Sequence, residues 1–207
     1  GVVSGIASNE QYTVTVKGET GHAGAIPMTR RQDTLLAASH MIHSVDDILK
    51  STPNTVGVVG SIENHPNIIN VIPEKTVFTI DFRAEKDDVR TITRERILES
   101  LTSIAERLNV DMEITCTAKR EPASCDNALT DMLRSTIASN DITPHTMFSG
   151  AGHEGLAMQD LTDVAMLFVR CEENSAGLES AVSIDDIEKA VEIIATFLNN
   201  LDADRLD

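Results

Sequence analysis

Residues 20–33, which read TGHAGAIPMTRRQD, contain a histidine with very small neighbours. His22 lies between Gly21 and Ala23, directly after a stretch that alternates like a strand, so its imidazole could be presented with little steric hindrance. Pro27 would fix the turn that follows. The alternative is a structural loop whose histidine only caps a turn, because histidine is often simply a partly buried polar residue.

A second candidate lies in residues 64–83, where Asn67, Asn70 and Pro73 precede a D-x-R sequence that ends at Arg83. The spacing puts Asn70 in a loop before a strand and Arg83 at the far end of that strand. A hairpin with turn-forming Asn and Pro residues and a surface arginine would explain the same pattern. On the residues alone, both interpretations stay open.

The third candidate is residues 149–155, SGAGHEG, which follow a predicted strand. Gly150 and Gly152 allow the backbone to approach a ligand closely, and His153 and Glu154 lie where a helix would begin. The segment does not contain the G-x-S-x-G sequence of a nucleophile elbow. A strand-to-helix turn that uses glycine for its geometry is the alternative.

Together the three segments resemble the zinc amidohydrolases, a metallopeptidase family of aminoacylases, carboxypeptidase-G-like enzymes, N-carbamoyl-L-amino-acid hydrolases and allantoate amidohydrolases. The sequence G-H-A-G-x-x-P-M-x-x-R-x-D from Gly21 resembles the motif of that family's lid, or dimerisation, domain. The sequences P-N-x-x-N-V-I-P with D-x-R, and S-G-A-G-H from Ser149, resemble later motifs. The form His-Ala-Gly-x-x-Pro-Met is most similar to the carbamoylase and allantoate branch. The matches fall in the family's order and span nearly the whole chain.

The resemblance implies roles for five residues. His22 would reach into the active site of a neighbouring subunit and steady the substrate carbonyl as it becomes tetrahedral, which is the work of an oxyanion donor. Asn70 and Arg83 would bind the substrate carboxylate, for which the planar fork of arginine is suited. Gly152 and His153 would line the substrate pocket beside the metals. We therefore expect a homodimer, formed through the lid domain, that takes a small carboxylate substrate.

The resemblance also implies two zinc or manganese ions, and here the sequence departs from the family. All ligands but the last, and the glutamate that acts as general base, belong to an N-terminal half that this sequence lacks. The last ligand, a histidine, would fall at Gly177 and a nearby glutamate at Ala181, and no histidine follows His153. A zinc hydrolase needs about three protein ligands and a metal-bound water. We therefore expect this chain to bind no metal by itself.

A predicted helix offers another arrangement of metal-binding side chains. His40 and His43 are three residues apart, and Asp46 and Asp47 follow them. The H-E-x-x-H pattern of metalloproteases is absent, so the sequence supports this site only weakly.

Hydrophobic periodicity predicts the elements that must position the first two candidates. Alternating apolar and polar residues indicate strands, and apolar residues three and four apart indicate amphipathic helices. The predicted strands are 11–17, 55–63, 75–83 and 110–118, and the predicted helices are 31–50 and 88–108. The order β-α-β-β-α-β predicts an α+β, ferredoxin-like lid domain over residues 1–120, with a four-stranded antiparallel sheet and two helices on one face.

Residues 121–207 show a different pattern. The predicted elements are helix 126–139, strand 145–148, a short helix, strand 163–169 and helix 184–201. A continuous apolar strand belongs in a sheet covered on both faces, yet two parallel strands and three helices do not form an independent domain. We expect this segment to be the C-terminal α/β portion of a larger catalytic domain, whose remainder is absent or is supplied by a separate N-terminal half.

Composition excludes some partners. The formal net charge is −16 without a long basic run, which argues against nucleic acid and against an anionic membrane surface. No stretch reaches the roughly 18 apolar residues of a membrane span. Cys116, Cys125 and Cys171 form no C-x-x-C pair, which suits free thiols in the reducing cytoplasm. The apolar start at Gly1, without Met, is typical of a cut or processed chain.

Three functions stay open. The first is the C-terminal portion of a metal-dependent amidohydrolase that cleaves a C–N bond of a small N-carbamoyl, ureido or N-acyl amino acid and is inactive alone. The second is a non-catalytic dimerisation or binding module derived from that family, favoured by the replacements at Gly177 and Ala181. The third is a stand-alone sensor of small acids that uses Asn70 and Arg83.

Overall fold

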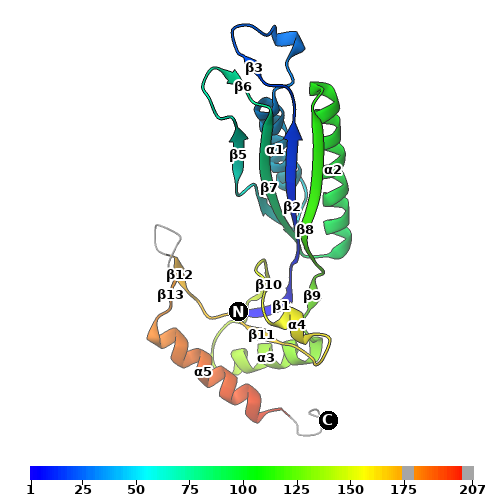
Figure 1. Ribbon diagram of the computed structural model, residues 1–207. Coiled ribbons are helices and arrows are strands. Elements are labelled where there is room, and N and C mark those ends of the chain that lie inside the picture. Colours follow the sequence, from blue (N-terminus) through cyan, green and yellow to red (C-terminus); the bar gives the residue numbers. More distant parts are fainter. Residues whose placement is uncertain (174–179, 202–207) are drawn as a thin grey trace. The chain divides into compact units, whose positions relative to one another are not determined.

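The computed structural model describes residues 1–173 and 180–201, and the chain divides into two compact units (Figure 1). One unit is continuous, Ala7–Pro122, and the other combines Gly1–Ile6 with the chain from Ala123 onward. Within the described residues the fold is α/β, with five α-helices and with both parallel and antiparallel strand pairs.

An antiparallel sheet forms the centre of the continuous unit. Its strand order is β4 (Thr55–Val58), β7 (Lys75–Ala84), β2 (Ser8–Lys17) and β8 (Asp111–Arg120), and β5 (Ile62–His65) also pairs with β7. Even-numbered residues of β2 and β7 are buried, whereas odd-numbered ones are half-buried or exposed. The register places Tyr12 opposite Ile80 and Val14 opposite Phe78. One face of the sheet is therefore apolar, as the alternation in the sequence predicts.

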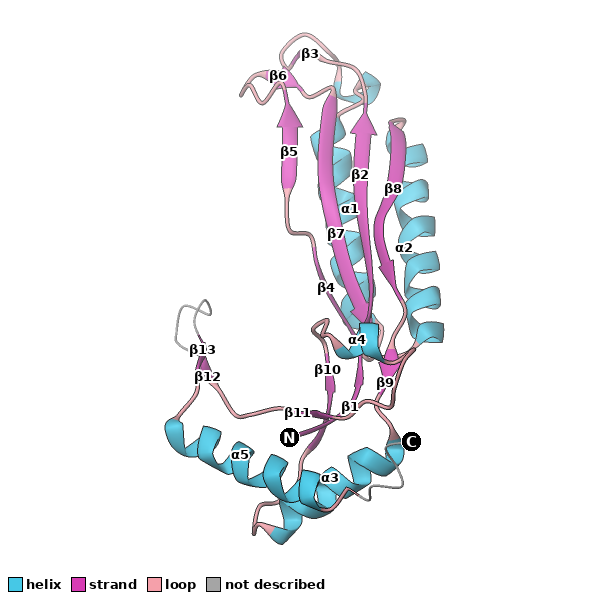
Figure 2. Cartoon of the chain, turned by 60° about the horizontal axis from the view of Figure 1, so that its bottom comes forward, coloured by secondary structure: helices cyan, strands magenta, loops and turns pink. Residues whose placement is uncertain are grey.

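Two helices, α1 (Thr34–Ser51) and α2 (Asp87–Leu108), cover the apolar face (Figure 2). Helix α1 begins after Asp33, whose carboxylate accepts a hydrogen bond from the backbone N–H of Leu36 at 3.0 Å. Asn109, which follows the last residue of α2, caps this helix in the left-handed conformation with φ of 52°. The main core of the unit includes Val14, Val16, Ala38, Met41, Val45, Phe78, Ile80, Phe82, Ile97 and Leu101.

A buried ionic cluster joins α2 to β2. Glu10 is 0% exposed and Arg90 is 2% exposed. Arg90 Nη1 donates to Glu10 Oε1 at 2.6 Å, and Arg94 Nη1 lies 3.4 Å from the same oxygen. The hydroxyl of Tyr12 donates to Glu10 Oε2. Both oxygens of the buried carboxylate therefore have partners, which is the condition under which a charge is tolerated in a protein interior.

Strand β1 (Val2–Ile6) is the central strand of a small mixed sheet in the other unit. Strand β10 (Thr146–Ser149) pairs with it in parallel, whereas β11 (Met166–Leu167) and β9 (Ala123–Ser124) pair with it antiparallel. Val2 and Val3 are 0% exposed, so this strand lies at the centre of the unit's core.

Helices α3 (Asn127–Ser139) and α5 (Ile184–Asn199) bury Leu133, Ile137 and Ile193 against Val2. The remaining elements of this unit are α4 (Gly155–Met158), β12 (Glu172–Glu173) and β13 (Ser180–Ala181). No helix in the described part of the chain combines the length and apolar character needed to cross a bilayer.

The elements predicted for residues 1–120 are present in the predicted order, with one subdivision. The strand predicted at 55–63 consists of β4 and β5, which are separated around Gly60. Two short strands, β3 (Gly21–His22) and β6 (Val71–Ile72), and the 3-10 helix Met28–Arg30 were not predicted. The assignment of this unit as a ferredoxin-like lid stays a prediction.

The second unit differs more from the expectation. Residues 1–6 were grouped with the first domain, whereas the structure groups them with the chain after Ala123. The strand predicted at 163–169 was wrong in length and direction, because only Met166–Leu167 pairs, antiparallel to β1. The carbonyl oxygen of Val164, which precedes this pair, accepts the N–H of Asp126 at 2.8 Å.

Candidate functional site

His22 lies at the tip of the continuous unit, in β3, which pairs with β6 (Figure 1). Its side chain is exposed. Nδ1 accepts a hydrogen bond from the backbone N–H of Gly24 at 3.0 Å. A neutral imidazole whose Nδ1 accepts carries its proton on Nε2. Nε2 of His22 is therefore set up as a hydrogen-bond donor.

Arg31 stabilises the loop that follows His22 through hydrogen bonds to the loop backbone. Its Nε and Nη2 donate to the carbonyl oxygen of Ile26 at 3.1 and 3.0 Å, and Nη2 also donates to that of Ala23. The loop packs closely on Gly21, because a Cβ at this position would lie 2.7 Å from Ile26 Cγ1 and the Ile26 side chain would have to move. The sequence prediction placed Arg31 in a helix, but α1 begins later and Arg31 binds the loop instead.

Asn70 lies beside His22 at the tip. The carbonyl oxygen of Asn70 accepts the N–H of Ala23 at 2.9 Å, and the next residue, Val71, pairs with His22. Asn67 has a φ of 55°, the left-handed conformation that asparagine tolerates in turns. The structure therefore brings together two of the predicted site residues, His22 and Asn70, from separate segments.

The same tip exposes apolar side chains. Ile69 is 105% exposed, Met28 71% and Ile68 53%. A groove of about 660 Å³ also lies here, lined mainly by Ala23, Arg31, Leu35, Leu36, Asn67, Ile68 and Ile69. Exposed apolar groups that cluster in this way are typical of surfaces that contact another molecule.

Arg83 lies at the other end of the sheet. It pairs with Asn9, near the start of β2, whereas Lys75 at the tip end of β7 pairs with Lys17. At about 3.4 Å per residue, the strand between Lys75 and Arg83 is about 27 Å long. Asn70 lies beyond Lys75, so one small carboxylate cannot contact Asn70 and Arg83 of the same chain.

Asp81 holds the Arg83 side chain from the same strand face. Arg83 Nε donates to Asp81 Oδ1 at 3.2 Å, while Gln11 Nε2 and Asn9 Nδ2 donate to Asp81 Oδ2 at 2.7 and 3.0 Å. Burial alone would raise the pKa of Asp81, but the hydrogen bonds from Gln11, Asn9 and Arg83 and the charge of Arg83 outweigh it and lower that pKa. Sequence reasoning gave Asp81, Asn9 and Gln11 no role, although period-two alternation already places them on one face with Arg83.

His153 lies in the other unit, in the loop between β10 and α4. Its Nε2 is 2.7 Å from the hydroxyl of Ser149, which is buried, and its ring lies 5.4 Å from that of Phe168. The hydroxyl of Ser149 also accepts the N–H of Ala151 at 3.2 Å. Gly152 is exposed in the same loop. The hydrogen bond with Ser149 and the contact with Phe168 therefore fix the His153 ring, and Gly152 is its neighbour in the same loop.

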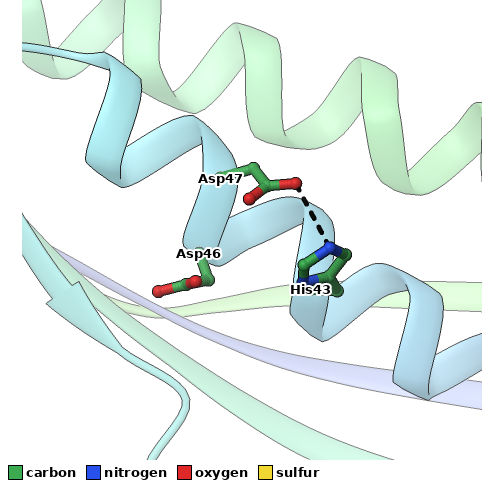
Figure 3. A group of neighbouring side chains, drawn as sticks. All are labelled: His43, Asp46 and Asp47. Atoms are coloured by element: carbon green, nitrogen blue, oxygen red, sulfur yellow. Dashed lines mark ion pairs between the residues drawn. The ribbon is translucent and has the colours of Figure 1, made fainter.

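Among the described residues, one group of three His, Cys, Asp or Glu side chains has ligand atoms close together, and it consists of His43, Asp46 and Asp47 on α1 (Figure 3). All three are exposed, and His43 Nε2 lies 3.5 Å from Asp47 Oδ2. Asp46 is held by Lys50 at 2.6 Å. This solvated helix face does not match the enclosed ligand set that a hydrolytic zinc site requires. The described residues of this chain therefore do not fit the metal centre implied by the resemblance.

The two positions where the resemblance expects a histidine and a glutamate fall near β13. Gly177 lies outside the described residues. Ala181 pairs with Glu172 in the β12–β13 hairpin, where its methyl group can neither bind a metal nor transfer a proton.

The comparisons with known proteins agree with the motifs. The model of the peptidase family M20/M25/M40 matches residues 9–200. The chain is 32% identical over 197 residues to an N-carbamoyl-L-amino-acid amidohydrolase of Pseudomonas sp. (strain NS671), which covers 94% of this chain and 48% of the relative. It is 30% identical over 203 residues to the allantoate amidohydrolase of Escherichia coli (strain K12), covering 97% of this chain and 49% of the relative.

A solved structure shows the same fold. The amidase of the hydantoinase/carbamoylase family from Burkholderia multivorans superposes with a TM-score of 0.87 at 27% identity, covering 95% of this chain and 48% of that one. The α/β fold and the matched motifs are those of this family. The chain belongs to peptidase family M20/M25/M40, which confirms the resemblance. It spans about half the length of these relatives.

Proposed function

We propose that this chain is the substrate-binding portion of a metal-dependent amidohydrolase that cleaves a C–N bond of a small N-carbamoyl, ureido or N-acyl amino acid. Its continuous unit would be the ferredoxin-like lid, and its second unit the C-terminal part of the catalytic domain. The relatives' names, N-carbamoyl-L-amino-acid and allantoate amidohydrolases, support this substrate class. The metal, zinc or manganese, would supply the activated water and would be held by residues outside this chain.

The observation that carries the proposal is the separation of Asn70 from Arg83. Both are assigned to one substrate carboxylate, yet the length of β7 keeps them about 27 Å apart or more in one chain. A shared site in a homodimer resolves this conflict. In that arrangement His22 and Asn70 of one copy reach the Arg83 of a second copy. The exposed apolar tip at Met28, Ile68 and Ile69 supports such a contact.

In this site each side chain would have a distinct task. The Nε2–H of His22 would donate to the substrate carbonyl oxygen as it gains negative charge, which favours the transition state over the ground state. Arg83 would bind the carboxylate through its planar guanidinium, and Asn70 would add a neutral donor. Gly152 and His153 are assigned to the pocket lining by the resemblance.

The test uses this chain combined with a polypeptide that carries the N-terminal half of a relative, in the presence of zinc or manganese. The substrates are N-carbamoyl-L-amino acids and allantoate. We expect hydrolysis by the assembled protein and none by this chain alone. His22→Ala and Arg83→Ala should each remove activity, whereas Glu113→Gln, on an exposed part of β8, should not.

Mixing the two inactive variants distinguishes a shared site from a site within one chain. A mixed dimer has one site with both His22 and Arg83 intact, so random pairing restores about a quarter of the original activity. An inactive mixture with an active parent would contradict the shared site. If the assembled parent hydrolyses neither substrate class, the enzymatic proposal is wrong.

A second candidate is a non-catalytic dimerisation or binding module, favoured by Ala181 in the β12–β13 hairpin. It predicts a stable dimer and no hydrolysis by the assembled protein with any of these substrates. For such a module, Ala181→Glu, which restores the glutamate, would leave the assembled protein inactive. In the enzymatic proposal the assembled parent is active without this substitution.

A further inference from the structure

The Arg83 guanidinium must be oriented before it can bind a carboxylate with two parallel hydrogen bonds. Arginine presents its N–H groups in one rigid plane, on a long side chain that loses rotamer entropy when it is fixed. A partner at Nε sets that plane. Asp81 provides this partner at 3.2 Å, two residues away on the same strand.

Asp81 is itself fixed more firmly than a surface carboxylate. Its side chain is 24% exposed, and its second oxygen accepts hydrogen bonds from Asn9 and Gln11 on the neighbouring strand. The register explains the convergence, because Gln11 lies opposite Asp81 and Asn9 lies opposite Arg83. Two amides therefore hold a carboxylate that in turn holds a guanidinium.

The opposite face of β2 fixes the position of these two amides. Glu10, the residue between them, is locked by the buried hydrogen bond from Arg90 at 2.6 Å. A slip of β2 by one residue would place Glu10 on the open face and remove both amides from Asp81. The register that supports Asp81 is thus tied to a buried ion pair.

We propose that Asp81, held by Asn9 and Gln11, is a positioning residue that orients Arg83 for a substrate carboxylate. This inference rests on the proposed function, in which Arg83 binds that carboxylate. Asp81 does not touch the substrate. By holding the guanidinium in one orientation, Asp81 lowers the side-chain entropy that Arg83 loses when the substrate binds.

The first test measures orientation without any substrate. In the NMR spectrum of this chain, the Nε–Hε signal of Arg83 is assigned by its loss in Arg83→Lys. We expect Asp81→Asn to speed the exchange of this proton with water on the order of tenfold, the size expected for one hydrogen bond to a charged group. Glu113→Gln, which removes a carboxylate at the other end of the same sheet, should leave the exchange unchanged. Unchanged exchange in Asp81→Asn would overturn the proposal.

The second test uses the assembled protein. We expect Asp81→Asn to raise KM for N-carbamoyl-L-alanine on the order of tenfold with kcat nearly unchanged, because only binding orientation is affected. Arg83→Lys should raise KM as well, and adding Asp81→Asn to it should have no further effect. Asparagine differs from aspartate by one atom, and the backbone amide spectrum verifies that the variant is folded.

The outcomes separate this inference from the proposed function. If Arg83→Lys raises KM and Asp81→Asn does not, the positioning role is overturned while the binding role of Arg83 stands. If neither substitution changes KM, the binding role of Arg83 is overturned, and the positioning role falls with it.

Discussion

The hydroxyl of Tyr12 donates a hydrogen bond to Oε2 of Glu10 at 2.5 Å, on the helix-covered face of the sheet. Tyr12 is 8% exposed and stacks on Phe82, with ring centroids 6.4 Å apart. Burial, the hydrogen bond to Glu10 and the negative charge of Glu10 all raise the pKa of the Tyr12 phenol above its ordinary value.

We predict that Tyr12 resists ionisation while the protein is folded. The unfolded chain loses the phenol proton near pH 10, and the folded chain only at higher pH. The folded state therefore binds more protons above pH 10, and its stability falls as pH rises through that region. Tyr12 is the only tyrosine and the sequence contains no tryptophan, so phenolate absorbance reports this residue alone. Phenolate absorbance that rises near pH 10, before circular dichroism shows unfolding, would contradict the prediction.

Breaking the buried Glu10–Arg90 pair should be costly. Arg90→Met leaves the Glu10 carboxylate buried with its main partner lost, and we expect the free energy of unfolding to fall by about 3–5 kcal/mol in urea titrations. The double variant Glu10→Gln with Arg90→Met should be more stable than Arg90→Met alone, because it leaves no buried charge. Lys17→Met, which removes the partner of exposed Glu113, is the control and should cause no measurable loss. Equal losses in the free energy of unfolding for Arg90→Met and Lys17→Met would contradict the prediction that burial makes the Glu10–Arg90 pair costlier to break.

Gly57 is tightly packed and Gly60 is not, so alanine at each position compares the same substitution with and without a steric clash. A Cβ on Gly57 would lie 2.6 Å from the carbonyl oxygen of Asp81 and 2.9 Å from Phe82 Cβ, contacts that real structures avoid. At Gly60 the nearest atom would be Thr79 Oγ1 at 3.9 Å. We predict that Gly57→Ala lowers the free energy of unfolding by about 1–3 kcal/mol and that Gly60→Ala does not. A thermal unfolding scan of both variants tests this, and equal midpoints would contradict it.

The edge formed by β4 and β5 should be part of the homodimer interface. Among the described residues these strands pair only with β7, and Val56, Val58 and Ile62 are about half exposed there. Unpaired strand edges with apolar side chains associate readily. We predict that Val58→Lys shifts the protein from dimer to monomer in light scattering. Ile92→Lys places the same charge on an exposed apolar position of α2 and should leave the dimer intact. A parent chain that is monomeric at high concentration would rule out this interface.

Alternation and helical periodicity sufficed to predict the central sheet and both helices of the continuous unit. The same alternation places Asp81 and Arg83 on one face, because residues two apart on a strand share a face. The proximity of His22 and Asn70 was not predictable in this way. It depends on the two-residue pairing of β3 with β6, and such short strands leave no periodic pattern in the sequence.

Strand β1 shows a second limit of sequence reasoning. Val2, Val3 and Ile6 are apolar but too few to reveal a partner, and β10 lies far along the chain. The prediction for 163–169 failed for a related reason. Its continuous apolar run indicated a buried strand, but Met166 and Leu167 are only half-buried. Burial alone also does not determine the direction in which a strand pairs.

The pairing of Val2 with Thr146 has a consequence for the order in which the chain can fold during synthesis. The continuous unit, Ala7–Pro122, has all of its strands and helices before β10 is made. Strand β1 must wait for β10, and at about 5–20 residues per second the ribosome needs roughly 7–30 s to synthesise the chain from Val2 to Thr146. Until then Val2 and Val3, which are fully buried in the finished unit, lack their parallel partner, although Ala7–Pro122 can already be folded.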